Sequence, residues 1–259
     1  MSVHFSPASP PVIAGTGSLL QLIDGLDLIL PCYNPPGDWV NNLIRHYQEV
    51  LHILPYITLQ LIIVNDGSSR NFGAEHIQQL RVAIPGVIIV TYPVNRGKGH
   101  AVREGIKRAS NNHQICTDLD FPFGTTVIRE VYEQLLNGAD IVVGERGSAY
   151  LELLPAKRRV LTRVGRMINR LVLKLPVDDA QAGLKGFNIT GRHVLERTSV
   201  DGFLYDSEFI YKASRTYQLR IKPIIISCRP GIRFSSFRIK LLIKELRNYL
   251  KILKNEYPK

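Results

Sequence analysis

The chain has 259 residues, of which 45 % are hydrophobic and 21 % are charged, a composition typical of a folded globular protein and not of a disordered or fibrous one. Its 33 lysines and arginines outnumber 22 acidic residues, and the formal net charge of +11 predicts an anionic partner such as nucleic acid, a phosphorylated ligand or an acidic membrane surface. Three cysteines in or beside apolar runs are too few for a disulfide framework, which favours a reducing, cytoplasmic location.

The beginning of the chain, residues 1–24, contains three prolines and no lysine or arginine. This composition predicts a loose leader and argues against a secretory signal. No apolar run in the sequence approaches the ~20 residues that span a bilayer. We therefore expect a cytoplasmic protein that is soluble or lies peripherally on the cytoplasmic face of a membrane.

From Asp27 onward, short apolar runs alternate with segments of helical periodicity. The runs predict buried strands over residues 28–30, 59–64, 87–90, 114–117 and 140–144. Apolar residues at helical spacing predict helices over residues 40–54, 74–83, 99–109 and 125–136. This alternation indicates βαβ units and an α/β fold with a mostly parallel sheet. Because such sheets bind ligands where loops leave the carboxyl ends of strands, the polar residues after these runs form the candidate site.

Two segments of the second half are basic and amphipathic. Residues 157–174 contain seven lysines and arginines and no acidic residue, with apolar residues interleaved at helical spacing. Residues 236–259 repeat the pattern, and we expect this tail to form a helix on an anionic membrane surface. The plain alternative for both segments is a solvated surface that covers the core. The predicted organisation is a leader over 1–24, one folded domain over 25–235 and a helical tail over 236–259.

The strongest local signal is Asp118-Leu119-Asp120 at the end of the fourth predicted strand. In an extended segment the two carboxylates emerge on one side, about 7 Å apart along the chain. Paired carboxylate oxygens there suit Mg²⁺ or Mn²⁺ bound together with a diphosphate. For an isolated Asp-x-Asp, a solvated loop is the plainer interpretation, but the other polar strand ends favour a site.

Four further segments carry polar residues at turns or helix starts. Residues 65–69, Asn-Asp-Gly-Ser-Ser, fit a plain turn, and Asp66 also fits an acceptor for a nucleobase N–H. Residues 95–99, Asn-Arg-Gly-Lys-Gly, combine glycines and cations at a predicted helix start, which favours a bound phosphate. Residues 178–187 concentrate acids, an amide and a lysine between glycines, and Asp206 fits a helix cap as well as a site.

Six motifs follow one another along the chain: Pro31-x-Tyr33-Asn34, Val64 to Ser68, Asn95 to Gly99, Asp118-x-Asp120, Asp179 to Phe187 and Asp206-x-Glu208. Taken in this order, they resemble those of family 2 glycosyltransferases of the GT-A fold, a Rossmann-like, mostly parallel sheet flanked by helices. Within that family the chain is most similar to the dolichyl-phosphate and polyprenyl-phosphate hexosyltransferases. The resemblance runs from about Asp27 to about Ser236 and would make this region the catalytic domain.

The resemblance implies an inverting, metal-dependent transfer of a hexose from a nucleotide-diphosphate sugar to a lipid phosphate at a membrane surface. It implies donor contacts from Pro31, Tyr33, Asn34, Asp66, Arg96, Gly97, Lys98 and Asp118. It places Mg²⁺ or Mn²⁺ on Asp118 and Asp120. It places catalytic residues beside the sugar at Asp179, Gln181 and Lys185, and acceptor contacts at Arg159, Arg163 and Asp206.

The chain departs from the family pattern at two motifs. Pro35, Pro36 and Gly37 follow the Tyr-Asn pair, where the family usually has an acidic residue. Pro122 stands two residues after Asp120, where relatives tend to have a polar residue, so one metal ligand is expected to be water or another group. The sequence also predicts none of the transmembrane helices that many relatives carry.

The nature of the acceptor decides whether the reaction needs a base. A phosphate oxygen is already anionic at neutral pH, whereas a hydroxyl must lose its proton to a carboxylate, for which Asp179 is the candidate. The seven cations of residues 157–174 favour the phosphate, and transfer to a hydroxyl of a glycan or other acceptor stays open.

Two different classes compete with this interpretation. A sugar-phosphate nucleotidyltransferase also uses an α/β sheet and two acids, but it would want a glycine-rich, basic loop directly after the first strand. A module that binds nucleic acid would explain the positive charge but not the ordered acids at strand ends, so no nucleic-acid partner is expected.

Overall fold

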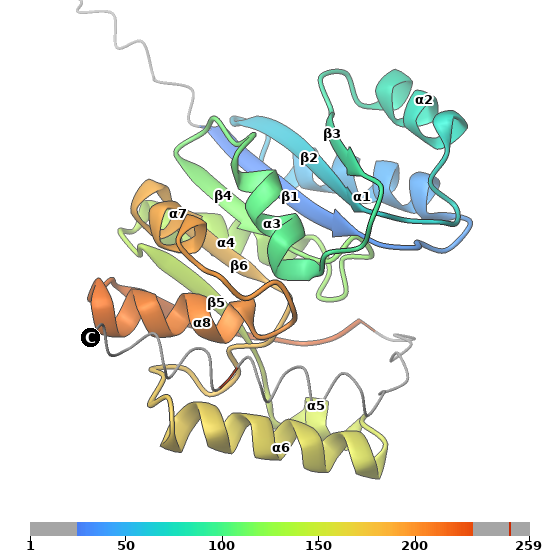
Figure 1. Cartoon of the computed structure of the whole chain (residues 1–259). Coiled ribbons are helices and arrows are strands. Elements are labelled where there is room, and N and C mark those ends of the chain that lie inside the picture. Colours follow the sequence, from blue (N-terminus) through green and yellow to red (C-terminus); the bar gives the residue numbers. More distant parts are fainter. Residues whose placement is uncertain (1–24, 230–248, 250–259) are drawn as a thin grey trace, which may run out of the picture.

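A seven-stranded sheet organises the protein, whose computed structural model describes residues 25–229 and Tyr249 (Figure 1). Along the sheet the strands follow the order β3-β2-β1-β4-β6-β5-β7. The strands are β1 (Gly25–Cys32), β2 (Thr58–Asp66), β3 (Ile88–Tyr92), β4 (His113–Cys116), β5 (Ile141–Arg146), β6 (Lys185–Asn188) and β7 (Ile221–Ile226). β6 runs antiparallel to both of its neighbours, and the other neighbouring pairs are parallel.

Helices cover both faces of the sheet, as Figure 1 shows. One face carries α1 (Trp39–Ile53), α2 (Ala74–Ala83) and α4 (Thr126–Leu136). The other carries α3 (Lys98–Ile106), α7 (Ile189–Glu196) and α8 (Tyr205–Tyr211), which continues into a π-helical turn over Lys212–Thr216. Two helices lie beside the sheet and not on it: α5 (Ser148–Glu152) and α6 (Ala156–Leu171).

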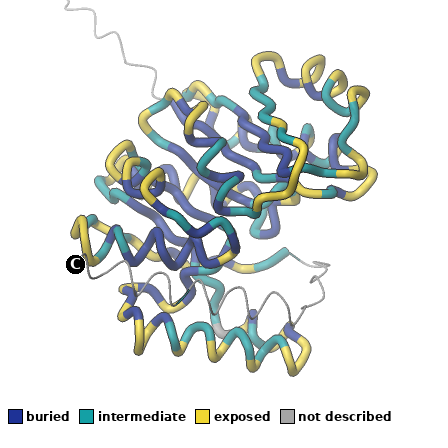
Figure 2. Tube along the Cα trace, viewed as in Figure 1, coloured by how far each residue is buried: buried dark blue, intermediate teal, exposed yellow. Residues whose placement is uncertain are grey.

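The two faces bury separate hydrophobic clusters because successive side chains of a strand point to opposite faces. In β1, Leu28 and Leu30 join the cluster under α1 and α4, whereas Ile29 joins the cluster under α3 and α8. In β2, Leu61 lies on the first face and Ile62 on the second. The continuous apolar runs of the sequence are therefore strands covered on both sides, which Figure 2 shows as the buried centre of the molecule.

The five predicted strands and four predicted helices are all present, with bounds shifted by a few residues, and the basic segment that begins at Lys157 forms α6. The sequence pattern does not predict β6, because its four residues, Lys-Gly-Phe-Asn, show neither an apolar run nor alternation. The predicted leader over 1–24 and tail helix over 236–259 lie outside the described residues, apart from Tyr249. Among the helices that the structure describes, none combines the length and apolar character that crossing a bilayer requires.

Candidate functional site

One amide side chain holds together the loops that leave β1 and β2. Asn34 Oδ1 accepts hydrogen bonds from the backbone N–H groups of Ser69 (2.8 Å) and Arg70 (3.1 Å). Asn34 has a φ of +47°, a left-handed conformation in which asparagine is enriched. Beside it, Tyr33 is 54 % exposed, whereas Pro31 is half-buried in β1. This edge of the sheet therefore presents an accessible aromatic ring next to a fixed loop.

Asp66 is buried at the end of β2 and fixes the loop between β3 and α3. Its Oδ1 accepts the backbone N–H of Arg96 (2.7 Å), and its Oδ2 accepts the backbone N–H of Gly97 (2.9 Å) and the side-chain amide of Asn95 (2.9 Å). Gly97 has a φ of +110°, which favours glycine, and the chain enters α3 from this residue. The carboxylate expected to face a nucleobase thus organises the neighbouring loop, while the Arg96 side chain is exposed.

Lys98, the first residue of α3, forms an ion pair with the acid at the end of β4. Its Nζ lies 2.5 Å from Asp118 Oδ1. Burial works against the charged form of Lys98, but the carboxylates of Asp118 and Asp206 outweigh it and raise the pKa of Lys98 above its ordinary value. The lysine is therefore a firm positive charge at neutral pH.

Asp118 and Asp120 lie on a turn and not on an extended segment. β4 ends at Cys116, and the carbonyl of Asp118 accepts the backbone N–H of Phe121 at 3.0 Å. Phe121 has a φ of +45°, so the chain reverses directly after the second acid. The expected alternation along a strand was wrong, although the turn keeps both carboxylates at this edge of the sheet.

Arg229 supports this turn, and the sequence analysis did not predict its contacts. The guanidinium of Arg229 donates to the carbonyl oxygen of Asp120, and the backbone N–H of Arg229 donates to the carbonyl of Pro122 at 2.8 Å. Arg229 Nη1 also lies 3.3 Å from Nε2 of the buried His46, whose ring packs against Phe121. Arg229 and His46 are both remote from Asp120 in sequence. Only the polar His46 within an apolar helix face indicates, in the sequence, a polar contact at this place.

The two carboxylates fit a divalent cation that has further ligands. Loss of solvation at the turn and the negative charge of Asp118 both raise the pKa of Asp120, although this side chain keeps contact with solvent. Within the described part of the chain there is no group of three or more His, Cys, Asp and Glu side chains placed to hold a metal. The protein ligands would therefore be these two aspartates, with phosphate oxygens and water completing the set, as is common for Mg²⁺.

The loop before β6 lies directly against Asp118. A Cβ atom on Gly183 would overlap Asp118 Oδ2 and would lie 3.1 Å from Lys98 Nζ, so only glycine fits at this position without displacing its neighbours. Because β6 is antiparallel, its first residue, Lys185, pairs with Cys116 at the end of β4. The loop that precedes β6 therefore joins the loops that follow the parallel strands.

Lys185 and Asp206 lie beneath the site and not on an accessible surface. Their side chains form an ion pair of 3.0 Å, and both are almost fully buried. Lys185 also donates to the carbonyl of Ala182. Burial raises the pKa of Asp206 against the opposing charges of Lys185 and Lys98. The sequence analysis expected Lys185 beside the sugar and Asp206 beside the acceptor. In the structure the two side chains neutralise each other in the core, below Asp118 and Lys98.

Asp179 is buried and held by two guanidinium groups. Arg146 binds it with two nearly parallel contacts, Nε to Oδ2 at 2.6 Å and Nη2 to Oδ1 at 2.8 Å, and Arg166 Nη2 lies 2.9 Å from Oδ2. Burial alone would raise the pKa of Asp179, but the two arginines outweigh it and lower that pKa. Sequence reasoning missed Arg146, whose signal is its place at the end of a buried strand.

The remaining predicted residues lie on or opposite α6. Arg159 Nη2 donates to the carbonyls of Glu152 and Leu154, both at 3.2 Å, whereas Arg163 is exposed. Gln181 is half-buried, and its Oε1 lies 3.8 Å from the position that a Cβ of Gly165 would take. These three residues belong neither to the charged set around Asp118 nor to the arginines around Asp179.

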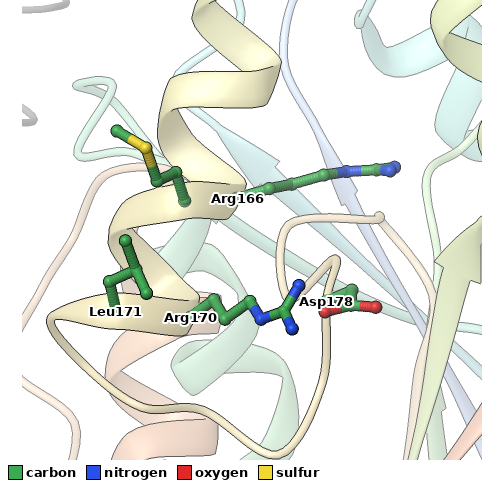
Figure 3. A pocket seen from close by; sticks show the side chains of 5 residues that line it. Arg166, Arg170, Leu171 and Asp178 are labelled. Atoms are coloured by element: carbon green, nitrogen blue, oxygen red, sulfur yellow. The ribbon is translucent and has the colours of Figure 1, made fainter.

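An open pocket separates α6 from the loop that carries Asp178. Its volume is about 450 Å³, and a second pocket of about 410 Å³ shares Arg170 and Asp178 with it. The first pocket is lined by Arg166, Met167, Arg170, Leu171 and Asp178. In Figure 3, Arg166 and Arg170 extend from the side of the helix that faces Asp178, and Leu171 projects from another side. Cationic and apolar groups thus border the same opening.

Two relatives with known names match parts of this chain. It is 24 % identical over 238 residues to a dolichol-phosphate mannosyltransferase of Pyrococcus furiosus, which covers 89 % of this chain and 64 % of that protein. Over 100 residues it is 38 % identical to a poly-beta-1,6-N-acetyl-D-glucosamine synthase of Staphylococcus epidermidis, covering 39 % of this chain and 23 % of that one. The chain therefore spans less than two thirds of the length of either relative.

Solved structures and a family model complete the comparison. Glucosyl-3-phosphoglycerate synthase from Mycobacterium tuberculosis, crystallised with uridine diphosphate, matches with a TM-score of 0.61 at 16 % identity over 92 % of this chain and 83 % of that one. The mannosyltransferase PcManGT from Pyrobaculum calidifontis, in complex with GDP-Man and Mn²⁺, matches with a TM-score of 0.53 at 15 % identity over 87 % and 64 %. These likenesses confirm the GT-A fold predicted from the motifs. Residues 27–201, more than half of the chain, match the model of Glycosyl transferase family 2, and the chain belongs to that family.

Proposed function

We propose that this protein transfers a hexose from a nucleotide-diphosphate sugar to the phosphate of a polyprenyl- or dolichyl-type lipid, with inversion at the anomeric carbon and with a divalent metal. The observation that carries the proposal is the pair Asp118 and Asp120 at the sheet edge where the Asn34 and Asp66 loops and the start of α3 meet. Family membership and the similarity to a dolichol-phosphate mannosyltransferase support it. They favour it over a nucleotidyltransferase or a nucleic-acid module.

On the donor side, the nucleoside would lie against the exposed ring of Tyr33, between Pro31 and the loop that Asn34 holds. The loop over Arg96, Gly97 and Lys98 would contact the diphosphate, because it offers two cations and the start of a helix. Asp66 would act on the donor through this loop, whose backbone N–H groups it already binds.

The metal would be held by Asp118 and Asp120. When bound, Mg²⁺ or Mn²⁺ supplies a Lewis acid that neutralises the charge growing on the leaving diphosphate. Solved proteins of the same fold are complexed with Mn²⁺ and a nucleotide sugar, which supports this expectation. Lys98 adds a fixed positive charge beside the two acids.

The acceptor argument comes from Asp179. In the proposed step an acceptor oxygen forms a bond to the anomeric carbon while the bond from that carbon to the diphosphate oxygen breaks, and the nucleoside diphosphate leaves with the electron pair. A hydroxyl acceptor would have to give its proton to a base, but Asp179 is buried, and its pKa is lowered by Arg146 and Arg166. A phosphate oxygen is already anionic, so the arrangement favours a phosphate.

The acceptor phosphate would approach the side of α6, where Arg159 and Arg163 lie and where Gln181 faces the helix. The pocket on the same helix is bordered by the guanidinium groups of Arg166 and Arg170, by apolar groups and by the carboxylate of Asp178. Its two cations outnumber the single acid, which suits a ligand with an anionic head and an apolar chain. The lipid would be presented at an anionic membrane surface on the cytoplasmic side.

The test is a transfer assay with purified full-length protein and radiolabelled UDP- and GDP-hexoses. Polyprenyl phosphate and the corresponding polyprenol serve as paired acceptors, each with Mn²⁺, with Mg²⁺ and with chelator. The proposal expects label in the phosphate lipid only, with metal present, and the product sugar in the opposite anomeric configuration. Label in neither lipid under any condition would overturn it.

A glycan hydroxyl is the second candidate acceptor, because the 38 % identity over 100 residues is to a poly-beta-1,6-N-acetyl-D-glucosamine synthase. Including short glycans as acceptors in the same assay separates the two. Transfer to a glycan and not to the lipid phosphate would replace the lipid acceptor and leave the donor side of the proposal in place.

A further inference from the structure

The helix α6 exposes an apolar stripe along its length. Val160, Val164, Met167 and Leu171 are 58 %, 41 %, 52 % and 64 % exposed. Their spacing of four, three and four residues places them on one face of a helix. Figure 2 shows much of this helix as exposed or half-buried. A helix of a soluble domain normally turns such a stripe toward the core, so this orientation needs a partner.

The opposite face of the same helix is anchored by a polar residue. Asn169 is 1 % exposed, and its Oδ1 accepts hydrogen bonds from the hydroxyls of Tyr249 (3.1 Å) and Ser207 (3.4 Å). Arg166 on the neighbouring side of the helix reaches the buried Asp179. These contacts fix the rotation of α6 about its axis, and the apolar stripe faces outward because the polar side is the one that is tied down.

The charge of the helix selects the partner. Residues 156–171 contain six lysines and arginines and no acidic residue, and Lys157, Arg163 and Arg170 are exposed. A second copy of this helix carries the same positive charge and would be repelled. Tyr249, in the segment over 236–259, contacts the opposite face of α6 at Asn169, and the seven basic against two acidic residues of that segment disfavour it as the partner of the apolar stripe. An anionic lipid surface offers both the negative charge and the apolar depth.

We propose that α6 is a membrane-docking helix, which inserts the stripe of Val160, Val164, Met167 and Leu171 into the interface of an anionic bilayer. The role of this docking in catalysis rests on the proposed function: docking through this face would bring the pocket lined by Arg166 and Arg170 to the lipid surface. The site of docking is thereby assigned to a helix inside the folded domain, separate from the tail over 236–259.

The experiment measures sedimentation of the full chain with vesicles of phosphatidylcholine alone and with about one third phosphatidylglycerol. The test variant is Val160→Gln combined with Val164→Gln, which does not touch the pocket lining and places a good helix former at both positions. The matched control is Val82→Gln, a valine that is 72 % exposed on α2, at the other end of the molecule (Figure 1).

We expect the wild type and Val82→Gln to bind the anionic vesicles equally, and the double variant to bind at least about tenfold more weakly. Salt should weaken the wild-type binding, and phosphatidylcholine alone should bind little. Circular dichroism and the melting temperature confirm that the double variant is folded.

Three results would overturn the inference. They are a wild type that binds neither vesicle, a double variant that binds like the wild type, and a wild-type dimer that the double variant converts to a monomer. Calorimetric titration with UDP- and GDP-hexoses is measured on the same samples. Vesicle binding without any nucleotide-sugar binding would contradict the proposed function and not the docking, and the reverse pattern would contradict the docking alone.

Discussion

The proposed donor side and the proposed acceptor side of this site are built by different kinds of hydrogen bond. On the donor side, Asp66 and Asn34 bind backbone N–H groups of neighbouring loops. On the acceptor side, the buried carboxylate of Asp179 is bound mainly by the side chains of Arg146 and Arg166. A loop held through its backbone keeps one shape, whereas a guanidinium group can pair with a phosphate as well as with a carboxylate. The first side is preorganised, and the second is able to respond to an anionic ligand.

The largest effect is expected where the two sides meet. Replacing Asp120 by Asn removes one negative charge from an exposed position, so the fold should persist. Transfer should fall about a thousandfold, because one of the two proposed carboxylate ligands of the metal is lost. Initial rates at saturating donor and Mn²⁺ measure this. Glu130→Gln, an exposed acid on α4, is the control and should leave the rate unchanged. Full activity of Asp120→Asn would contradict the metal assignment.

The preorganised side is broken by Asp66→Ala. The backbone N–H groups of Arg96 and Gly97 lose the buried carboxylate that binds them, and the Asn95 amide keeps only the backbone carbonyl of residue 66. We expect a loss of about 3 kcal/mol in the free energy of unfolding and a donor KM raised about a hundredfold. Urea denaturation and donor kinetics check the two effects. Asp66→Asn keeps one oxygen that accepts hydrogen bonds and should recover part of the stability and part of the donor affinity. Normal stability and a normal donor KM in Asp66→Ala would show that these hydrogen bonds are unimportant.

The responsive side is tested by Asp179→Asn. With a phosphate acceptor the rate should change by less than about tenfold, whereas loss of a general base would cost about a hundredfold or more. Because the folded pKa of Asp179 is lowered, its contribution to stability is full above the unfolded pKa of about 3.9 and is lost as the pH falls through the folded pKa. The stability difference between wild type and variant should therefore shrink below about pH 4 in urea titrations. A thousandfold loss of rate would favour a hydroxyl acceptor.

The smallest effect is expected from Arg163→Gln, because this cation is exposed and screened by solvent. The acceptor KM should rise about threefold at low ionic strength and hardly at all in high salt, while the donor KM stays constant. Arg81→Gln on α2, which is also exposed, serves as the control. An effect of Arg163→Gln on the donor KM would contradict the proposed assignment of this residue to the acceptor.

The sequence predicts the donor half of the fold well because its strands are buried on both faces. Continuous apolar runs such as residues 59–64 leave little choice but a covered strand, and the helices between them show clear periodicity. The polar residues at the carboxyl ends of these strands then follow from topology. The turn at Asp118 and Asp120 cannot be predicted in this way. Its reversal depends on the left-handed conformation of Phe121, which no local sequence pattern indicates.

The acceptor half is predicted less completely because its contacts join residues that are distant in the chain. Nothing near Lys185 shows that its charge is paired in the core with Asp206, or that Arg146 and Arg166 enclose Asp179. Charge pairs between separate elements depend on how those elements pack, and packing is not visible in local periodicity. The basic helix was predictable, but the outward direction of its apolar stripe follows from the burial of Asn169.

The antiparallel strand β6 also determines when the central sheet can form fully during synthesis. β4 pairs with β1 on one side, but its other side stays an open edge until residues 185–188 have left the ribosome. An open strand edge is a template for aggregation, and the long sequence separation makes its closure a late event. Fragments that end between β4 and β6 should therefore be poorly behaved, and a shortened chain with intact solubility must retain at least the segment through Asn188.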